Sequence, residues 1–183
     1  MKSTFSRTFA AAAVILLLAV VLLGTVFPVL VNQYLTEQTI SGLQNDAKVI
    51  SNLATAYTIE GSLDRRDFLL NLDVAADISE SDVVICNTEG RIVICTCPVH
   101  GCDHLGLDVD DAYLQKVLQN GGDTATGIIQ GLYEESRFVV SVPILSGDGN
   151  SFAGIVIVST PTAATIAIQN RIFRIFMTTG LAA

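Results

Sequence analysis

The chain has 183 residues, of which 50% are hydrophobic and only 15% charged, and its formal net charge is −8. The length suits one ordinary domain, but the composition is too apolar for a simple soluble one. The acidic charge, the absence of Trp and an aromatic content of 7% argue against a nucleic-acid partner, because such binding depends on basic side chains and stacked aromatic rings.

A membrane anchor is predicted near the N-terminus. Residues 9–31 (FAAAAVILLLAVVLLGTVFPVLV) carry no charge, and a helix of that length crosses a hydrocarbon core of roughly 30 Å. The run exceeds the apolar segment of about 7–15 residues in a signal peptide, which favours a retained span. Lys2 and Arg7 precede it, so the positive-inside rule predicts residues 1–8 in the cytoplasm and residues 32–170 outside.

Two helices are predicted next. Apolar residues recur every three to five positions up to about Tyr57, which is the spacing of an amphipathic helix continuing from the anchor. They are Leu35, Ile40, Leu43, Ala47, Ile50, Ala54 and Tyr57. Gly61 ends this helix, and the residues of a second apolar stripe are Phe68, Leu69, Leu72 and Ala76.

Five strands and one more helix follow. Residues 82–86 and 91–95 are β-branched runs on either side of Asn87-Thr88-Glu89-Gly90, which predicts a hairpin. Asp108 or Asp110 can cap a helix that ends at Gly121. The last strands are predicted at residues 124–129, 137–145 and 152–160. Residues 32–162 are therefore expected to form one α+β domain, a five-stranded antiparallel sheet with the long first helix on one face.

The C-terminal residues 163–183 return to a helical, apolar pattern after Pro161. Few residues follow the last charged one, Arg174, so they are too short to cross a bilayer as given. We expect a juxtamembrane helix and the start of a second transmembrane helix, truncated within the span.

This layout resembles the extracytoplasmic, PAS-like sensor region (Cache/PDC type) of bacterial membrane receptors, especially two-component sensor histidine kinases. The resemblance rests on the anchor with its exit helix, the hairpin at residues 82–95 (DVVICNTEGRIVIC) and the closing strands at residues 137–145 (RFVVSVPIL) and 152–161 (FAGIVIVSTP). It implies a bacterial cell membrane location, a small-molecule, ion or redox signal, a homodimer, and a cytoplasmic kinase that acts on a response regulator. Similar ectodomains occur on chemotaxis receptors and cyclic-dinucleotide enzymes.

No HAMP linker, phosphoacceptor helix or ATP-binding box is present in the sequence. The chain alone is therefore not predicted to be a kinase, and no cofactor is expected. The alternative interpretation is a membrane-anchored ligand-binding or structural domain. An exported thiol enzyme using Cys95 and Cys97 ranks last, since no C-x-x-C motif is present.

The segment CTCPVHGCDH holds three of the four cysteines and both histidines. Cys95, Cys97, Cys102 and His104 could bind zinc, but their spacing is not a usual zinc spacing, and thiols outside the cytoplasm tend to oxidise. A disulfide is therefore favoured over a metal site.

The predicted hairpin limits the pairing of the cysteines. With Thr88 and Glu89 as the turn, Cys86 faces Arg91 rather than Cys95, so Cys86 is expected to be a buried thiol. Cys95 and Cys97, separated by one residue, are too close in an extended chain to bond easily. Cys95–Cys102 and Cys97–Cys102 remain open, and the sensor resemblance implies Cys95–Cys102, because related sensor domains have a similar Cys-x-His-x-Gly loop.

The resemblance also implies a ligand pocket between the sheet and residues 97–108, with His104, Tyr133 and Arg137 as candidate ligand-binding residues. Arg137 could hold a carboxylate bidentately, and the alternative is a solvated side chain at a strand start. Tyr57 and Tyr113 are expected to be half-buried helix residues. The acidic residues Asp103, Asp108, Asp110 and Asp111 are expected to cap or solvate a turn rather than bind Ca²⁺ or Mg²⁺.

Overall fold

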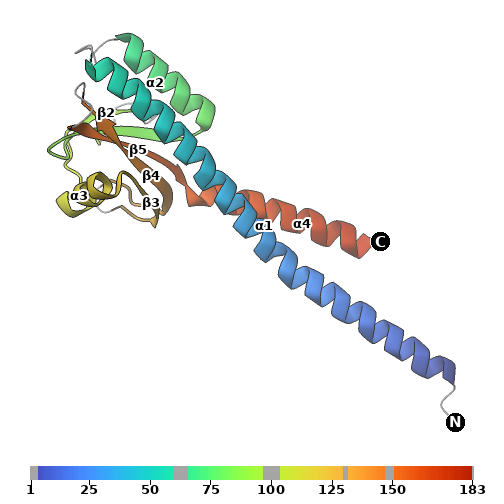
Figure 1. Ribbon diagram of the computed structural model, residues 1–183. Helices are drawn as coiled ribbons and strands as arrows, with labels where there is room; N and C mark the ends of the chain where they lie inside the picture. Colours follow the sequence, from blue (N-terminus) through green and yellow to red (C-terminus); the bar gives the residue numbers. More distant parts are fainter. Residues whose placement is uncertain (1–3, 60–65, 97–103, 130–131, 147–150, 183) are drawn as a thin grey trace. The chain divides into compact units, whose positions relative to one another are not determined.

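A computed structural model describes residues 4–59, 66–96, 104–129, 132–146 and 151–182. Its elements, shown in Figure 1, are α1 (Thr4–Ile59), α2 (Arg66–Ser79), β1 (Asp82–Asn87), β2 (Ile92–Cys95), α3 (Asp111–Asn120), β3 (Asp123–Gly127), β4 (Arg137–Leu145), β5 (Phe152–Pro161) and α4 (Thr162–Ala182). The chain divides into two compact units. One is Gln38–Thr165, and the other combines α1 up to Glu37 with the chain from Ile166.

The five strands form one antiparallel sheet in the order β2-β1-β5-β4-β3. The predicted order of elements and the α+β class are confirmed. The last strand, β5, lies at the centre of the sheet and pairs with β1 on one side and β4 on the other. Its residues from Gly154 to Ser159 are buried, which explains why its sequence is apolar without alternation.

The register predicted for the β1–β2 hairpin is wrong by one residue. Cys86 pairs with Ile92 rather than Arg91, and the register shifts between Ile85 and Cys86. The Asn87 N–H donates to the Arg91 carbonyl at 2.9 Å, so three residues rather than two lie in the loop. Gly90 closes this loop at φ 82°, a conformation that favours glycine and is typical of three-residue hairpin loops.

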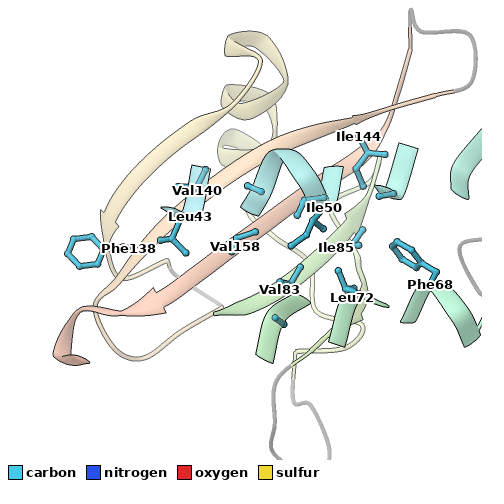
Figure 2. Packing of buried hydrophobic residues seen from close by; sticks show 14 residues of the cluster. Leu43, Ile50, Phe68, Leu72, Val83, Ile85, Phe138, Val140, Ile144 and Val158 are labelled. Carbon is cyan, nitrogen blue, oxygen red and sulfur yellow. The ribbon is translucent and has the colours of Figure 1, made fainter. Parts of the chain in front are cut away.

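One face of the sheet is covered by α1 and α2 (Figure 1). Figure 2 shows how side chains from both helices meet alternate residues of the strands. The buried residues of this cluster are Leu43, Ala47, Ile50, Ala54, Phe68, Leu72, Ala76, Val83, Ile85, Phe138, Val140, Ile144, Val156 and Val158. The predicted helical stripe is therefore packed against the chain's own sheet from Ile40 to Tyr57, and Leu35 is not part of this cluster.

The opposite face of the sheet, called here the α3 face, is covered by α3 and the loops beside it. Its buried residues are Val84, Cys86, Ile92, Val109, Leu114, Val117, Leu132, Tyr133, Val139, Ile155 and Ile157. Asp110 is the N-cap of α3 and accepts a hydrogen bond from the Ala112 N–H at 3.3 Å, as predicted for one of the two candidate caps. The candidate ligand-binding residues lie on this face.

Among the described residues, one helical stretch is long and apolar enough to cross a membrane, by length and composition. It lies within α1, between Arg7 and Thr58. Residues after Pro161 are helical, as predicted. The truncated second span stays a prediction.

Candidate functional site

Arg137 begins β4 and is almost fully buried, with 5% of its side chain exposed. Alternate strand residues share a face, so Arg137 lies on the same face as Val139, which is one of the buried residues of the α3 face. Its guanidinium lies over the ring of Tyr133, with Cζ 4.3 Å from the ring centroid. The alternative interpretation, in which Arg137 is a solvated side chain at a strand start, is therefore wrong.

The guanidinium of Arg137 donates from all three of its nitrogens. Nε donates to Ser159 Oγ at 3.2 Å, and Nη2 donates to the Asp82 carboxylate and, at 3.4 Å, to the Ser159 carbonyl. Nη1 donates to Glu135 Oε1 at 2.7 Å. One cation thus faces two carboxylates, a pairing that a buried charge requires.

The three residues predicted to bind ligand lie in one cluster. Besides its contact with Arg137, Tyr133 accepts a hydrogen bond at its hydroxyl from Ser159 Oγ at 2.9 Å. The His104 ring meets the Tyr133 ring edge-on, with centroids 5.2 Å apart and an interplanar angle of 67°. An imidazole, a phenol and a guanidinium therefore share one end of the α3 face.

Sequence reasoning missed the partners of Arg137, which are Asp82, Glu135 and Ser159. The sequence offers a weak signal for two of them: Asp82 is a charged residue at the start of a predicted strand, and Ser159 is a polar residue at the end of a continuous apolar run. Their roles depend on the pairing of β5 with both β1 and β4, which places Ser159 opposite Asp82 and Val139. The sequence alone does not provide that pairing.

A second polar contact on the α3 face joins α3 to β4. The Tyr113 hydroxyl and Ser141 Oγ are 2.6 Å apart. Burial raises the pKa of Tyr113, an effect that the hydrogen bond to Ser141 partly opposes. Tyr113 and Tyr57 are both half-buried, as predicted, and Tyr57 packs against Phe68.

The acidic residues near α3 have structural roles within the described part of the chain. Asp108 pairs with Arg91 at 3.2 Å, and both side chains are exposed. Asp110 caps α3. In residues 104–129 and the other described ranges, no group of three metal-ligating side chains is present, and Asp103 lies outside them.

The cysteines divide into a buried thiol and the segment around Cys95. Cys86 is free and buried, as predicted. Cys95 is disulfide-bonded, and its Sγ lies 3.8 Å from Nδ1 of His104. Because Cys97, His100 and Cys102 lie outside the described residues, the pairing with Cys102 stays a prediction. The zinc alternative needs Cys95 as a thiolate, and a disulfide-bonded Cys95 cannot supply one.

Cys86 is expected to be chemically inert while the domain is folded. Burial raises its pKa from 9.0 to about 12, and the thiolate is the reactive form. At neutral pH its thiolate fraction should fall roughly a thousandfold, since each pKa unit is tenfold. Timed alkylation with iodoacetamide, read by mass spectrometry, should label Cys86 only after denaturant is added. Rapid labelling of the native chain would contradict this.

No protein-family model matches the sequence, and no curated protein matches it. Solved structures do match. The E. coli DcuS sensor domain is 14% identical with a TM-score of 0.54, over 73% of this chain and 98% of that one. The V. cholerae histidine kinase DctB sensor domain is 10% identical with a TM-score of 0.52, over 74% of this chain and 57% of that one.

The ligand-binding domain of the amino acid chemoreceptor PctC from Pseudomonas aeruginosa, solved with GABA, is 12% identical. Its TM-score is 0.51, over 76% of this chain and 64% of that one. The chain thus spans less than two thirds of the DctB and PctC domains. At these identities the likeness concerns the fold, and the chain has the Cache/PAS-like fold of sensor domains of histidine kinases and ligand-binding domains of chemoreceptors.

Proposed function

We propose that residues 32–162 are the extracytoplasmic, ligand-sensing domain of a membrane receptor, with His104, Tyr133 and Arg137 at the ligand site. The observation that carries this proposal is the shared fold, which extends over 98% of the DcuS sensor domain. The PctC domain was solved with a small molecule, GABA, which supports a small-molecule signal. The cluster on the α3 face supplies polar groups that could orient such a ligand.

We propose a histidine kinase as the output, acting on a cytoplasmic response regulator, because DctB carries a sensor domain of this fold. A chemoreceptor is the second candidate, favoured by PctC. The reading frame beyond the codon for Ala183 distinguishes them. A phosphoacceptor helix and an ATP-binding domain would support the kinase, and a chemotaxis signalling domain would support the receptor. A stop codon would contradict both and leave an anchored binding domain.

We propose that residues 9–31 cross the bacterial cell membrane with residues 1–8 in the cytoplasm. The apolar helical stretch of α1 supports this. Protease added to intact spheroplasts should digest residues 32–170 and leave an N-terminal tag untouched. Protection of the sensor domain until the membrane is lysed would contradict the extracytoplasmic location.

Ligand binding should stabilise the domain. A compound that binds the folded state at roughly a hundred times its Kd stabilises it by about 2.7 kcal/mol. We expect at least one of acetate, succinate, L-alanine and GABA to raise the melting temperature of the full chain in nanodiscs. Tyr133→Leu should abolish that shift. Tyr57→Leu, on the opposite face of the sheet, is the control and should keep it. Equal shifts in both variants would place the ligand elsewhere.

We also propose the Cys95–Cys102 disulfide and a homodimer. The disulfide is supported by the bonded state of Cys95 and the free state of Cys86, and peptide mapping without reductant tests it. A dimer cannot use the α1 residues between Leu43 and Ala54 that are buried against the sheet. Other surfaces of the chain would have to form its interface.

A further inference from the structure

Two carboxylates bind Arg137, and they differ in how firmly they are held. Asp82 belongs to β1, inside the sheet, and 23% of its side chain is exposed. Glu135 lies in the loop before β4, and 54% of its side chain is exposed. The guanidinium is therefore anchored from within by Asp82 and Ser159, and is covered on its Nη1 side by a carboxylate that reaches it from solvent.

For electrostatic reasons, Glu135 and a ligand carboxylate cannot both pair with Arg137 at the same time. The cluster has one cation and two carboxylates, so a third carboxylate brought to Arg137 would face net repulsion. A ligand carboxylate could bind Nη1 only by replacing Glu135, which would leave the number of charges at Arg137 unchanged. Of the two ion pairs, the one between Arg137 and Glu135 is the more exposed. Its carboxylate is the one that a ligand can replace, since ion pairs open to water are held weakly.

The backbone beside Glu135 is bonded to the first residue of α4. The Ser136 carbonyl accepts hydrogen bonds from the Thr162 N–H at 3.0 Å and from Thr162 Oγ1 at 2.9 Å. Arg137 itself pairs with Pro161 in the sheet. Glu135 thus precedes by one residue the Ser136 carbonyl, whose hydrogen bonds hold the start of α4. A conformational change at Glu135 would act directly on these bonds.

We propose that Glu135 is a built-in competitor: its carboxylate occupies the face of Arg137 that a small carboxylate ligand would take, and its release is passed through Ser136 to α4. This inference rests on the sensor function proposed above and names its ligand class. The apparent ligand affinity is the intrinsic affinity multiplied by the fraction of molecules in which Glu135 has left Arg137. The ligand stabilises the arrangement in which Glu135 is free, which is the differential binding that a switch requires.

The test compares Glu135→Gln with Glu134→Gln in the full chain in nanodiscs. Glu134 is the adjacent exposed glutamate, and in the described residues it forms no ion pair with Arg137. The probes are acetate and succinate, with acetamide as the uncharged match. Titration calorimetry should show about tenfold tighter carboxylate binding to Glu135→Gln than to wild type, because a neutral competitor is weaker. Glu134→Gln should change carboxylate affinity less than about twofold. Acetamide brings no charge to pair with Arg137 and should bind neither wild type nor Glu135→Gln measurably.

A second measurement follows the switch in wild type. Saturating acetate should speed amide exchange at Thr162 several-fold, and acetamide should not. Equal carboxylate affinity in Glu135→Gln and Glu134→Gln would overturn the competitor role. If a probe binds wild type without a gain in Glu135→Gln, the sensor proposal stands and this inference fails. If no probe binds any variant, the assignment of this site to a small carboxylate fails as well.

Discussion

Replacing Arg137 with Met should lower the free energy of unfolding of the sensor domain by about 3–5 kcal/mol. The substitution keeps an apolar stem of similar length but removes a cation that is 4% exposed as a residue and is bound by Asp82, Glu135 and Ser159. Asp82 and Ser159 would then be left inside the fold without that donor. Hydrogen exchange of the β5 amides reports the loss, because central strands open only on global unfolding.

Arg91→Met is the matched control for Arg137→Met. Arg91 pairs with Asp108, and their side chains are 59% and 63% exposed. Such pairs contribute at most about 1 kcal/mol, so this variant should remain close to wild type. The double variant Arg137→Met with Asp82→Leu should recover part of the loss, since removing both charges costs less than removing one. Equal exchange rates in the two single variants would contradict the assigned role of Arg137.

Gly154→Ala should also destabilise the domain severely. Gly154 has φ 154°, and a Cβ built on it would lie 2.0 Å from the Cys86 carbonyl oxygen. Gly154 also lies opposite Asn87 in the ladder that joins β5 to β1. The clash is with the backbone of β1, which lies inside the sheet and cannot move aside without breaking that ladder. Adding strain of about 1–3 kcal/mol to overpacking of about 1–3 kcal/mol predicts a loss of roughly 2–6 kcal/mol.

Gly127→Ala is the control that shows the effect of the backbone conformation without the steric clash. Gly127 has a similar φ of 145°, but a Cβ there would have no neighbour within 4 Å. Only the conformational strain of about 1–3 kcal/mol is expected. Urea unfolding of the full chain in detergent can be monitored by tyrosine emission. The unfolding midpoint of Gly154→Ala should be much lower than that of Gly127→Ala. Similar midpoints would show that the close approach of β5 to Cys86 is relaxed in solution.

The element pattern could be predicted because it depends on local chemistry. The predicted strand at residues 137–145 has the bounds of β4, since β-branched residues are bounded there by turn residues. The stripe from Leu43 to Ala54 is buried, as its helical spacing predicts. The hairpin register failed at one residue because the Asn87 side chain accepts hydrogen bonds from Glu89 N and Arg91 N. These bonds favour a longer loop over the two-residue turn.

The candidate site could be predicted only in part. His104, Tyr133 and Arg137 do lie together, but the partners that hold Arg137 come from strands distant in the sequence. Asp82 reaches it only because β5 inserts between β1 and β4. Pairing of this kind is set by the burial of whole faces rather than by any local pattern. A single sequence therefore indicated the cationic residue without its counter-charges.

The junction between β5 and α4 has no connecting loop. β5 ends at Pro161 and α4 begins at Thr162, so the two elements are separated by a single peptide unit, about 3.8 Å from one Cα to the next. A connecting loop could change its conformation and absorb a displacement of the strand, whereas a single peptide unit can barely change its length. Any sliding of the central strand along its axis must therefore reach the first turn of the helix with almost no loss of amplitude.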